Sequence, residues 1–112
     1  MKLRIEFFKS HSHYFGPVLA LCRAVPGFQE TGEGAAKKYA VEFDDYTDRF
    51  QDIARLCSSW RGAFFFINGH RVHLFQIHRF FGDPVYHEKN RLKYLSGDDL
   101  LAELRNQHKP HA

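Results

Sequence analysis

The chain has 112 residues and a net charge of +3, and 44% of its residues are hydrophobic and 26% charged, which excludes intrinsic disorder except at the ends. This length suits one compact domain, so we expect a single domain over residues 1–107 and a flexible tail over 108–112. The longest apolar runs fall far below the roughly 20 residues of a membrane helix, and the N-terminus becomes polar too early for a secretory signal. We therefore expect a cytoplasmic protein.

Two segments in the first half alternate apolar and charged residues with the period of a half-buried strand, one over residues 2–8 and one over 38–43. Between them, Pro17 suits the first turn of a short helix, which Pro26 and the glycine after it must terminate. Residues 28–36 are rich in glycine and polar residues and predict a loop. Each strand has one polar side, so the sheet is expected to be covered on one face and partly wet on the other.

A second helix is predicted after Asp45, which resembles an N-cap with Asp48 at the third helical position. The apolar residues that follow have helical spacing: Tyr46, Phe50, Ile53, Cys57 and Trp60. A last helix is predicted where Ser96 precedes Asp99 by three residues, and it carries Leu100, Leu101 and Leu104. Residues 85–95 fit either a strand or a helix.

Asn68-Gly69 stands between two aromatic, β-prone runs and predicts a two-residue hairpin turn. This turn sets a register that pairs Ile67 with His70, Phe66 with Arg71, Phe65 with Val72, Phe64 with His73, Ala63 with Leu74 and Gly62 with Phe75. One face of the hairpin is then apolar. The other combines rings with basic groups: Phe64, Phe66, Arg71, His73 and Phe75.

The order of elements predicts an α+β fold, with an about four-stranded, mainly antiparallel sheet packed on two or three helices. If the hairpin joins the sheet in phase, its ring-rich face lies on the wetter side, beside Lys2, Arg4 and Lys38. Residues 60–93 also hold six Lys and Arg residues against two acidic ones. This regional charge favours an anionic partner, either nucleic acid or an acidic protein surface.

Rings that stack on bases and cations that meet phosphates predict a small binding module for single-stranded nucleic acid. Its candidate residues are Arg61, Phe64, Phe66, Arg71, His73, Phe75 and Arg79. The alternative is a protein-interaction or regulatory subunit that forms a homodimer through the same face. In a third interpretation the leucines of the last helix cover the rings within one chain.

A metal-dependent or ribonuclease-like enzyme is the remaining hypothesis, although binding is favoured over catalysis. His11 and His13 project together from an extended segment, and His73 approaches them if the first strand neighbours the hairpin, which would provide three imidazoles for a divalent metal. One of these histidines or His78 would act as a general base, and Arg71 or Arg79 would stabilise phosphate charge. No other cofactor is predicted, and the two cysteines are expected to be reduced core thiols.

Overall fold

The computed structural model describes residues 1–95 and 97–107 and confirms the α+β prediction. The five strands are β1 (Leu3–Phe8), β2 (Gln29–Thr31), β3 (Lys38–Phe43), β4 (Ala63–Ile67) and β5 (His70–Val72). The five α-helices are α1 (Phe15–Arg23), α2 (Asp48–Cys57), α3 (Leu74–Gly82), α4 (Pro84–Asn90) and α5 (Gly97–Gln107), with 3₁₀ turns η1 (Gly34–Ala36) and η2 (Leu92–Tyr94). None of these helices is long and apolar enough to cross a membrane.

The strands form one antiparallel sheet in the order β2-β3-β1-β4-β5, with β1 at its centre. The elements from β1 to β4 follow the order β-α-β-β-α-β, in which β3 lies between β1 and β2, and β1 lies between β3 and β4. This is the arrangement of the split β-α-β, or ferredoxin-like, motif. Strand β5 extends the sheet at one edge. The predicted loop over 28–36 is wrong in part, because residues 29–31 pair with β3 as the opposite edge strand.

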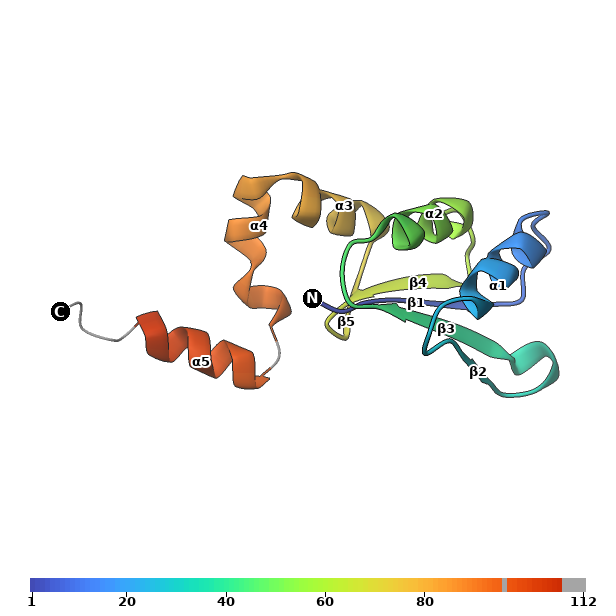
Figure 1. The fold of residues 1–112 in the computed structure, drawn as a ribbon, viewed down its shortest axis with the longest axis horizontal. Helices are drawn as coiled ribbons and strands as arrows, with labels where there is room; N and C mark the ends of the chain where they lie inside the picture. The colour runs from blue at the N-terminus through green and yellow to red at the C-terminus, as the bar shows by residue number, and fades with distance from the viewer. Residues whose placement is uncertain (96, 108–112) are drawn as a thin grey trace.

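The two faces of the sheet follow from the alternation seen in the sequence. On β1 the side chains of Leu3, Ile5 and Phe7 are fully buried, whereas Arg4 and Glu6 lie on the opposite face. Helices α1 and α2 lie together over the apolar face, above the sheet in Figure 1. Their buried cysteines, one on each helix, are free thiols as expected.

Helix α2 begins later than predicted. Its N-cap is Thr47, whose Oγ1 accepts the backbone N–H of Phe50 at 3.2 Å, because Asp45 is already engaged with the N–H of Tyr46 at 2.7 Å. The helix ends at Cys57, so Trp60 lies beyond it. The buried positions of the helix are Phe50, Ile53, Ala54 and Cys57, which keep the predicted helical spacing.

The predicted hairpin turn is confirmed, but the predicted hairpin is too long. Asn68 and Gly69 both have positive φ, +45° and +84°, as a type I′ turn requires. The predicted pairs of Phe65, Phe66 and Ile67 with β5 form as expected. The three further pairs are wrong, because the chain leaves the sheet after Val72 and continues as α3.

Helix α3 replaces the outer half of the hairpin because residues from Leu74 onward have helical spacing. Ile77 and Phe80 are fully buried against the core, which an extended strand could not achieve for both. The first turn is closed reciprocally, since the His73 N–H donates to Gln76 Oε1 at 2.8 Å and the Gln76 N–H donates to the His73 carbonyl at 3.0 Å. These hydrogen bonds and the burial of the apolar side chains stabilise the helix more than the additional pairs of a longer strand would stabilise the hairpin.

The C-terminal part runs away from the sheet. Asp83 caps α4 by accepting the N–H of Val85 at 3.0 Å and of Tyr86 at 3.2 Å, and the open choice over 85–95 is settled as helix and 3₁₀ turn. Tyr94 is fully buried beside Phe80. Helix α5 then projects from the body, and the molecule measures 59 × 27 × 23 Å (Figure 1). The predicted cap Ser96 lies outside the described residues.

Candidate functional site

The face of the sheet opposite α1 and α2 carries no helix among the described residues (Figure 1). We call it the open face. Its charged and aromatic side chains are Lys2 just before β1, Arg4, Glu6 and Phe8 on β1, Lys38 and Glu42 on β3, Phe64 and Phe66 on β4, and Arg71 on β5. The interpretation in which the leucines of α5 cover these rings within one chain is therefore wrong, since α5 points away from the sheet.

Ion pairs join the charged side chains at the centre of the open face. Glu6 accepts from Lys38 Nζ at 2.6 Å and from Arg4 Nε at 3.1 Å, while Arg4 Nη1 reaches Glu42 at 2.8 Å. Lys2 lies 3.9 Å from the same Glu42 carboxylate. Burial alone would raise the pKa of Glu6, but the hydrogen bonds and charges of Lys38 and Arg4 outweigh it and lower that pKa. These cations and carboxylates largely neutralise one another.

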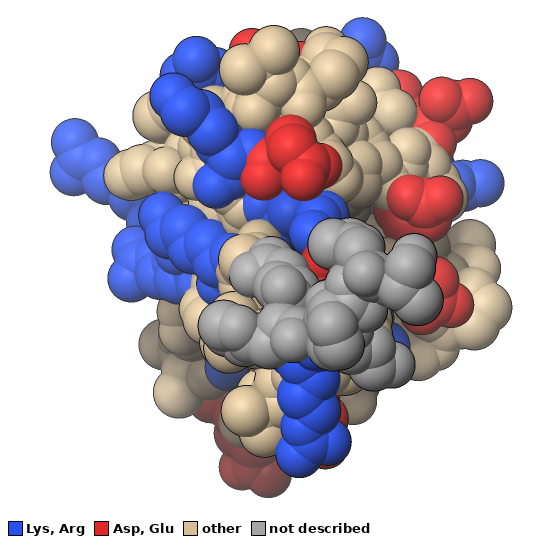
Figure 2. All heavy atoms as spheres, turned by 90° about the vertical axis from the view of Figure 1, so that its left-hand side faces the viewer, with Lys and Arg blue, Asp and Glu red and all other residues tan. Residues whose placement is uncertain are grey.

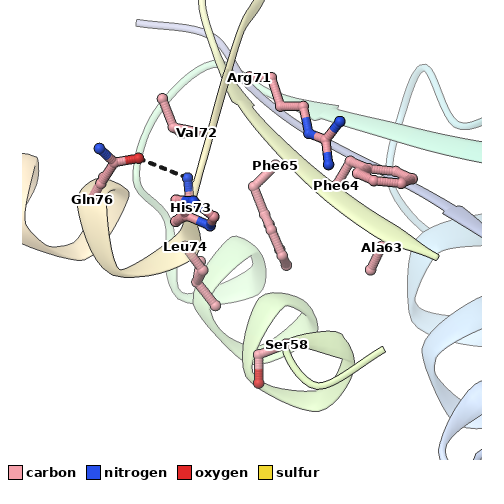
Figure 3. Close-up of a pocket in the computed structure, with 9 residues that line it drawn as sticks. All are labelled: Ser58, Ala63, Phe64, Phe65, Arg71, Val72, His73, Leu74 and Gln76. Atoms are coloured by element: carbon pink, nitrogen blue, oxygen red, sulfur yellow. Dashed lines mark hydrogen bonds between the residues drawn. The ribbon is translucent and has the colours of Figure 1, made fainter. Parts of the chain in front are cut away.

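Arg71 stands outside this network. Its side chain is exposed, and its guanidinium carbon lies 4.2 Å from the centre of the Phe64 ring. Figure 3 shows the guanidinium and the ring together on one side of the hairpin, while Phe65 and Leu74 point toward α2. The planar guanidinium therefore offers both a positive charge and a flat surface to solvent.

Three rings form a strip along β4 on the open face. Phe64 and Phe66 are half-buried, and Phe8 at the end of β1 is 38% exposed beside Gly62, whose carbonyl accepts the Phe8 N–H at 3.2 Å. We call Phe8, Phe64 and Phe66 the aromatic strip. Phe8 was missing from the candidate residues, although it has the same period-two phase as Arg4 and could have been found from it.

The other predicted site residues do not join the strip. Because the hairpin ends early, His73 and Phe75 lie at the start of α3, where their rings stack on each other at 5.7 Å and Phe75 is 66% exposed. Arg79 is farther along α3, over the ring of Tyr86 at 4.5 Å. Arg61 is exposed in the turn that precedes β4. Of the seven predicted residues, the structure places Phe64, Phe66 and Arg71 on one face.

A hollow of about 470 Å³ lies beside β4, where the chain leaves the sheet for α3 (Figure 3). It is lined by Phe64, Arg71 and His73 together with Ser58, Ala63, Phe65, Val72, Leu74 and Gln76. His73 thus stays close to two residues of the open face, although it does not share their strand. The hollow extends the open face around the edge of the sheet.

The basic character of residues 60–93 is divided in space. Arg71 belongs to the open face, whereas Arg79, Lys89 and Lys93 are exposed on α3, α4 and η2. Figure 2 views the molecule from the end where α4 and α5 lie, and Lys and Arg side chains gather on the left of this view. The open face therefore receives only part of the regional positive charge.

The proposed metal ligands are not brought together. Within residues 1–95 and 97–107, no three His, Cys, Asp or Glu side chains are placed to hold a metal ion, so His11, His13 and His73 do not form a site. The physical reason is the shortened hairpin, which leaves His73 at the outer edge beyond β5, while the other two follow the central strand. His78 hydrogen-bonds the Tyr46 hydroxyl through Nδ1 on the helical side of the molecule.

Comparison with protein-family models, with curated proteins and with solved structures finds no match for this chain.

Proposed function

We propose that this protein binds single-stranded nucleic acid through the open face, with the aromatic strip as the stacking surface and Arg71 as the contact to phosphate. The observation that carries this proposal is an uncovered sheet face that presents three partly exposed rings and a cation outside the ion pairs of that face. Stacking of bases on such rings contributes about 1 to 3 kcal/mol per base.

The electrostatics of the open face are compatible with a polyanion. The face carries four cations, Lys2, Arg4, Lys38 and Arg71, against the two carboxylates of Glu6 and Glu42. Because both carboxylates are held by the first three cations, their repulsion of a phosphate is reduced. A single strand fits better than a duplex, since only unpaired bases expose the flat surfaces that stack on rings.

The proposal includes a cytoplasmic location, where buried free thiols such as those of Cys22 and Cys57 stay reduced.

Fluorescence anisotropy with short labelled RNA and DNA strands at low salt tests the proposal. Phe64→Ala should weaken binding by roughly tenfold, through the loss of one stacking surface. Arg71→Glu should also weaken binding, and it should reduce the slope of log affinity against log salt concentration by about 1, the value for one phosphate contact. Phe75→Ala is the matched control, because it removes an equally large ring that lies on α3 and not on the open face.

Two outcomes would count against this function. Absence of any oligonucleotide binding at low salt would remove it. Equal loss of affinity in Phe75→Ala and Phe64→Ala would show that the binding surface lies elsewhere.

A second candidate function is protein interaction through the same face. The exposed leucines of α5 favour it, because they are apolar side chains to which the described part of the chain gives little cover: Leu101 is 53% exposed and Leu104 is 38% exposed.

A further inference from the structure

Helix α5 has an apolar side that the described residues cover only in part, since Leu101 and Leu104 are exposed and Leu100 is half-buried. Leu100, Leu101 and Leu104 follow the i, i+1, i+4 spacing that places them on one side of a helix. An ion pair joins α5 to the body, with Arg91 Nη2 2.6 Å from Glu103 Oε1. This contact leaves the helix projecting away from the sheet (Figure 1).

The aromatic strip matches this helix in length and in character. The leucines of α5 span about 6 Å along the helix axis, and Phe64 and Phe66 lie about 7 Å apart along β4. Each surface presents three apolar side chains, leucines on one and phenylalanines on the other. Packing the leucines on the rings would bury both surfaces from water.

The charges around the two surfaces are opposite in sign. Helix α5 carries three carboxylates, those of Asp98, Asp99 and Glu103, against the single cation Arg105. Arg91 of the body pairs with Glu103, and the two remaining carboxylates still leave the helix net negative. The open face carries four cations against two carboxylates. An acidic helix laid on this face is therefore attracted to it, whereas two open faces or two α5 helices would meet with like net charge.

We propose that α5 of one copy of this chain packs its leucines on the aromatic strip of a second copy, and reciprocally, so that the protein forms a two-fold symmetric dimer. The second copy is the occupant because α5 is held by Arg91 in an orientation that points away from its own sheet. A reciprocal exchange of this kind uses the same pair of surfaces twice and closes at two subunits. The inference deepens the second candidate function, since it identifies which element meets the open face.

The dimer and a bound nucleic acid strand would compete for the aromatic strip. The acidic residues of α5 would lie where the proposed function places phosphates, so the dimer would be the form that is closed to nucleic acid.

Analytical ultracentrifugation of the full chain over a wide range of concentration tests the dimer. Wild-type protein should approach twice the 13.2 kDa chain mass as concentration rises. Leu101→Asp and Phe66→Arg should each shift the dimer dissociation constant at least tenfold toward monomer. Ala102→Asp, on the opposite side of α5, and Phe75→Arg, on α3, are the matched controls and should dimerise like wild type. Circular dichroism of each variant establishes that it is folded.

A cross-linking experiment identifies the paired surfaces. Differently tagged copies carrying Leu101→Cys and Phe66→Cys should form a mixed disulfide with an added disulfide exchange reagent, whereas Leu101→Cys alone should not link to itself. The native cysteines are fully buried and do not compete. A disulfide between two Leu101→Cys copies would overturn the proposed arrangement in favour of pairing between two α5 helices. An internal disulfide in a dilute solution of the variant that carries both Leu101→Cys and Phe66→Cys would overturn it in favour of α5 folding back on its own sheet.

The two proposals fail separately. A chain that stays at 13.2 kDa at every concentration and still binds oligonucleotides overturns the dimer and leaves nucleic acid binding in place. A protein that dimerises but binds no oligonucleotide, even when Leu101→Asp makes it monomeric, overturns nucleic acid binding and leaves the dimer in place.

Discussion

Substitution of Asn68 should destabilise the protein more than an exposed turn residue normally does, because its side chain joins three parts of the fold. Its Oδ1 accepts the Lys2 N–H at 2.8 Å, at the start of β1. Its Nδ2 donates to the Tyr94 carbonyl at 2.7 Å, in η2. Its backbone has φ of +45°, which asparagine tolerates better than most residues.

The expected losses follow from these contacts. Asn68→Gly removes both side-chain hydrogen bonds at about 1 kcal/mol each and so lowers the free energy of unfolding by about 2 kcal/mol. Asn68→Ala loses the same bonds and also forces a Cβ-bearing residue without local hydrogen bonding into the left-handed region, which adds about 1 kcal/mol. The predicted order of stability is wild type, then the glycine variant, then the alanine variant.

Urea unfolding followed by the fluorescence of Trp60, the single tryptophan, measures these differences. Trp60 reports on the core because its ring packs against Phe7 at 5.8 Å and Phe15 at 6.1 Å. A glycine variant as stable as wild type would show that the two hydrogen bonds contribute nothing. Equal stability of the two variants would refute the argument from the left-handed backbone.

Three further predictions concern pH, thiols and competition. Glu6→Gln should lower the free energy of unfolding at neutral pH by about 1 kcal/mol. Because the fold lowers the pKa of Glu6 below the ordinary glutamate value of 4.5, this difference should be present above that value and disappear as pH falls through the lowered pKa, which urea unfolding at several pH values measures. Burial raises the pKa of Cys22 to about 11 and that of Cys57 to about 12. Both thiols should therefore resist a thiol reagent in the native state and react in urea, and rapid labelling of the native protein would contradict their burial. Leu101→Asp should bind oligonucleotides more tightly than wild type at concentrations where wild type is dimeric. Unchanged affinity would show that α5 does not cover the nucleic acid site.

The local features of the fold were predictable where a short-range pattern was sufficient. The alternation of apolar and charged residues identified β1 and β3, since side chains of a strand point to opposite faces in turn. The Asn68-Gly69 turn was predictable because both residues accept positive φ. The placement of Phe64, Phe66 and Arg71 on one face followed from that turn alone.

The predicted site extended too far because periodicity was ambiguous after Val72. Residues 73–75 continue an alternation that suits a strand, yet Leu74, Ile77 and Phe80 also have helical spacing. Burial of two of these side chains against the core, together with the reciprocal bonds between His73 and Gln76, decides for the helix. This tertiary choice removes His73 and Phe75 from the open face.

The sequence by itself determined which residues alternate, where the chain turns and which side of each strand is apolar, because these depend on neighbours only a few positions apart. Only the tertiary structure decided the strand order, which brings Glu6 between Lys38 and Arg4 and so neutralises the centre of the open face. It also decided that α5 projects outward and leaves the rings uncovered. Both results depend on contacts between residues far apart in the chain, whose energies no local pattern contains.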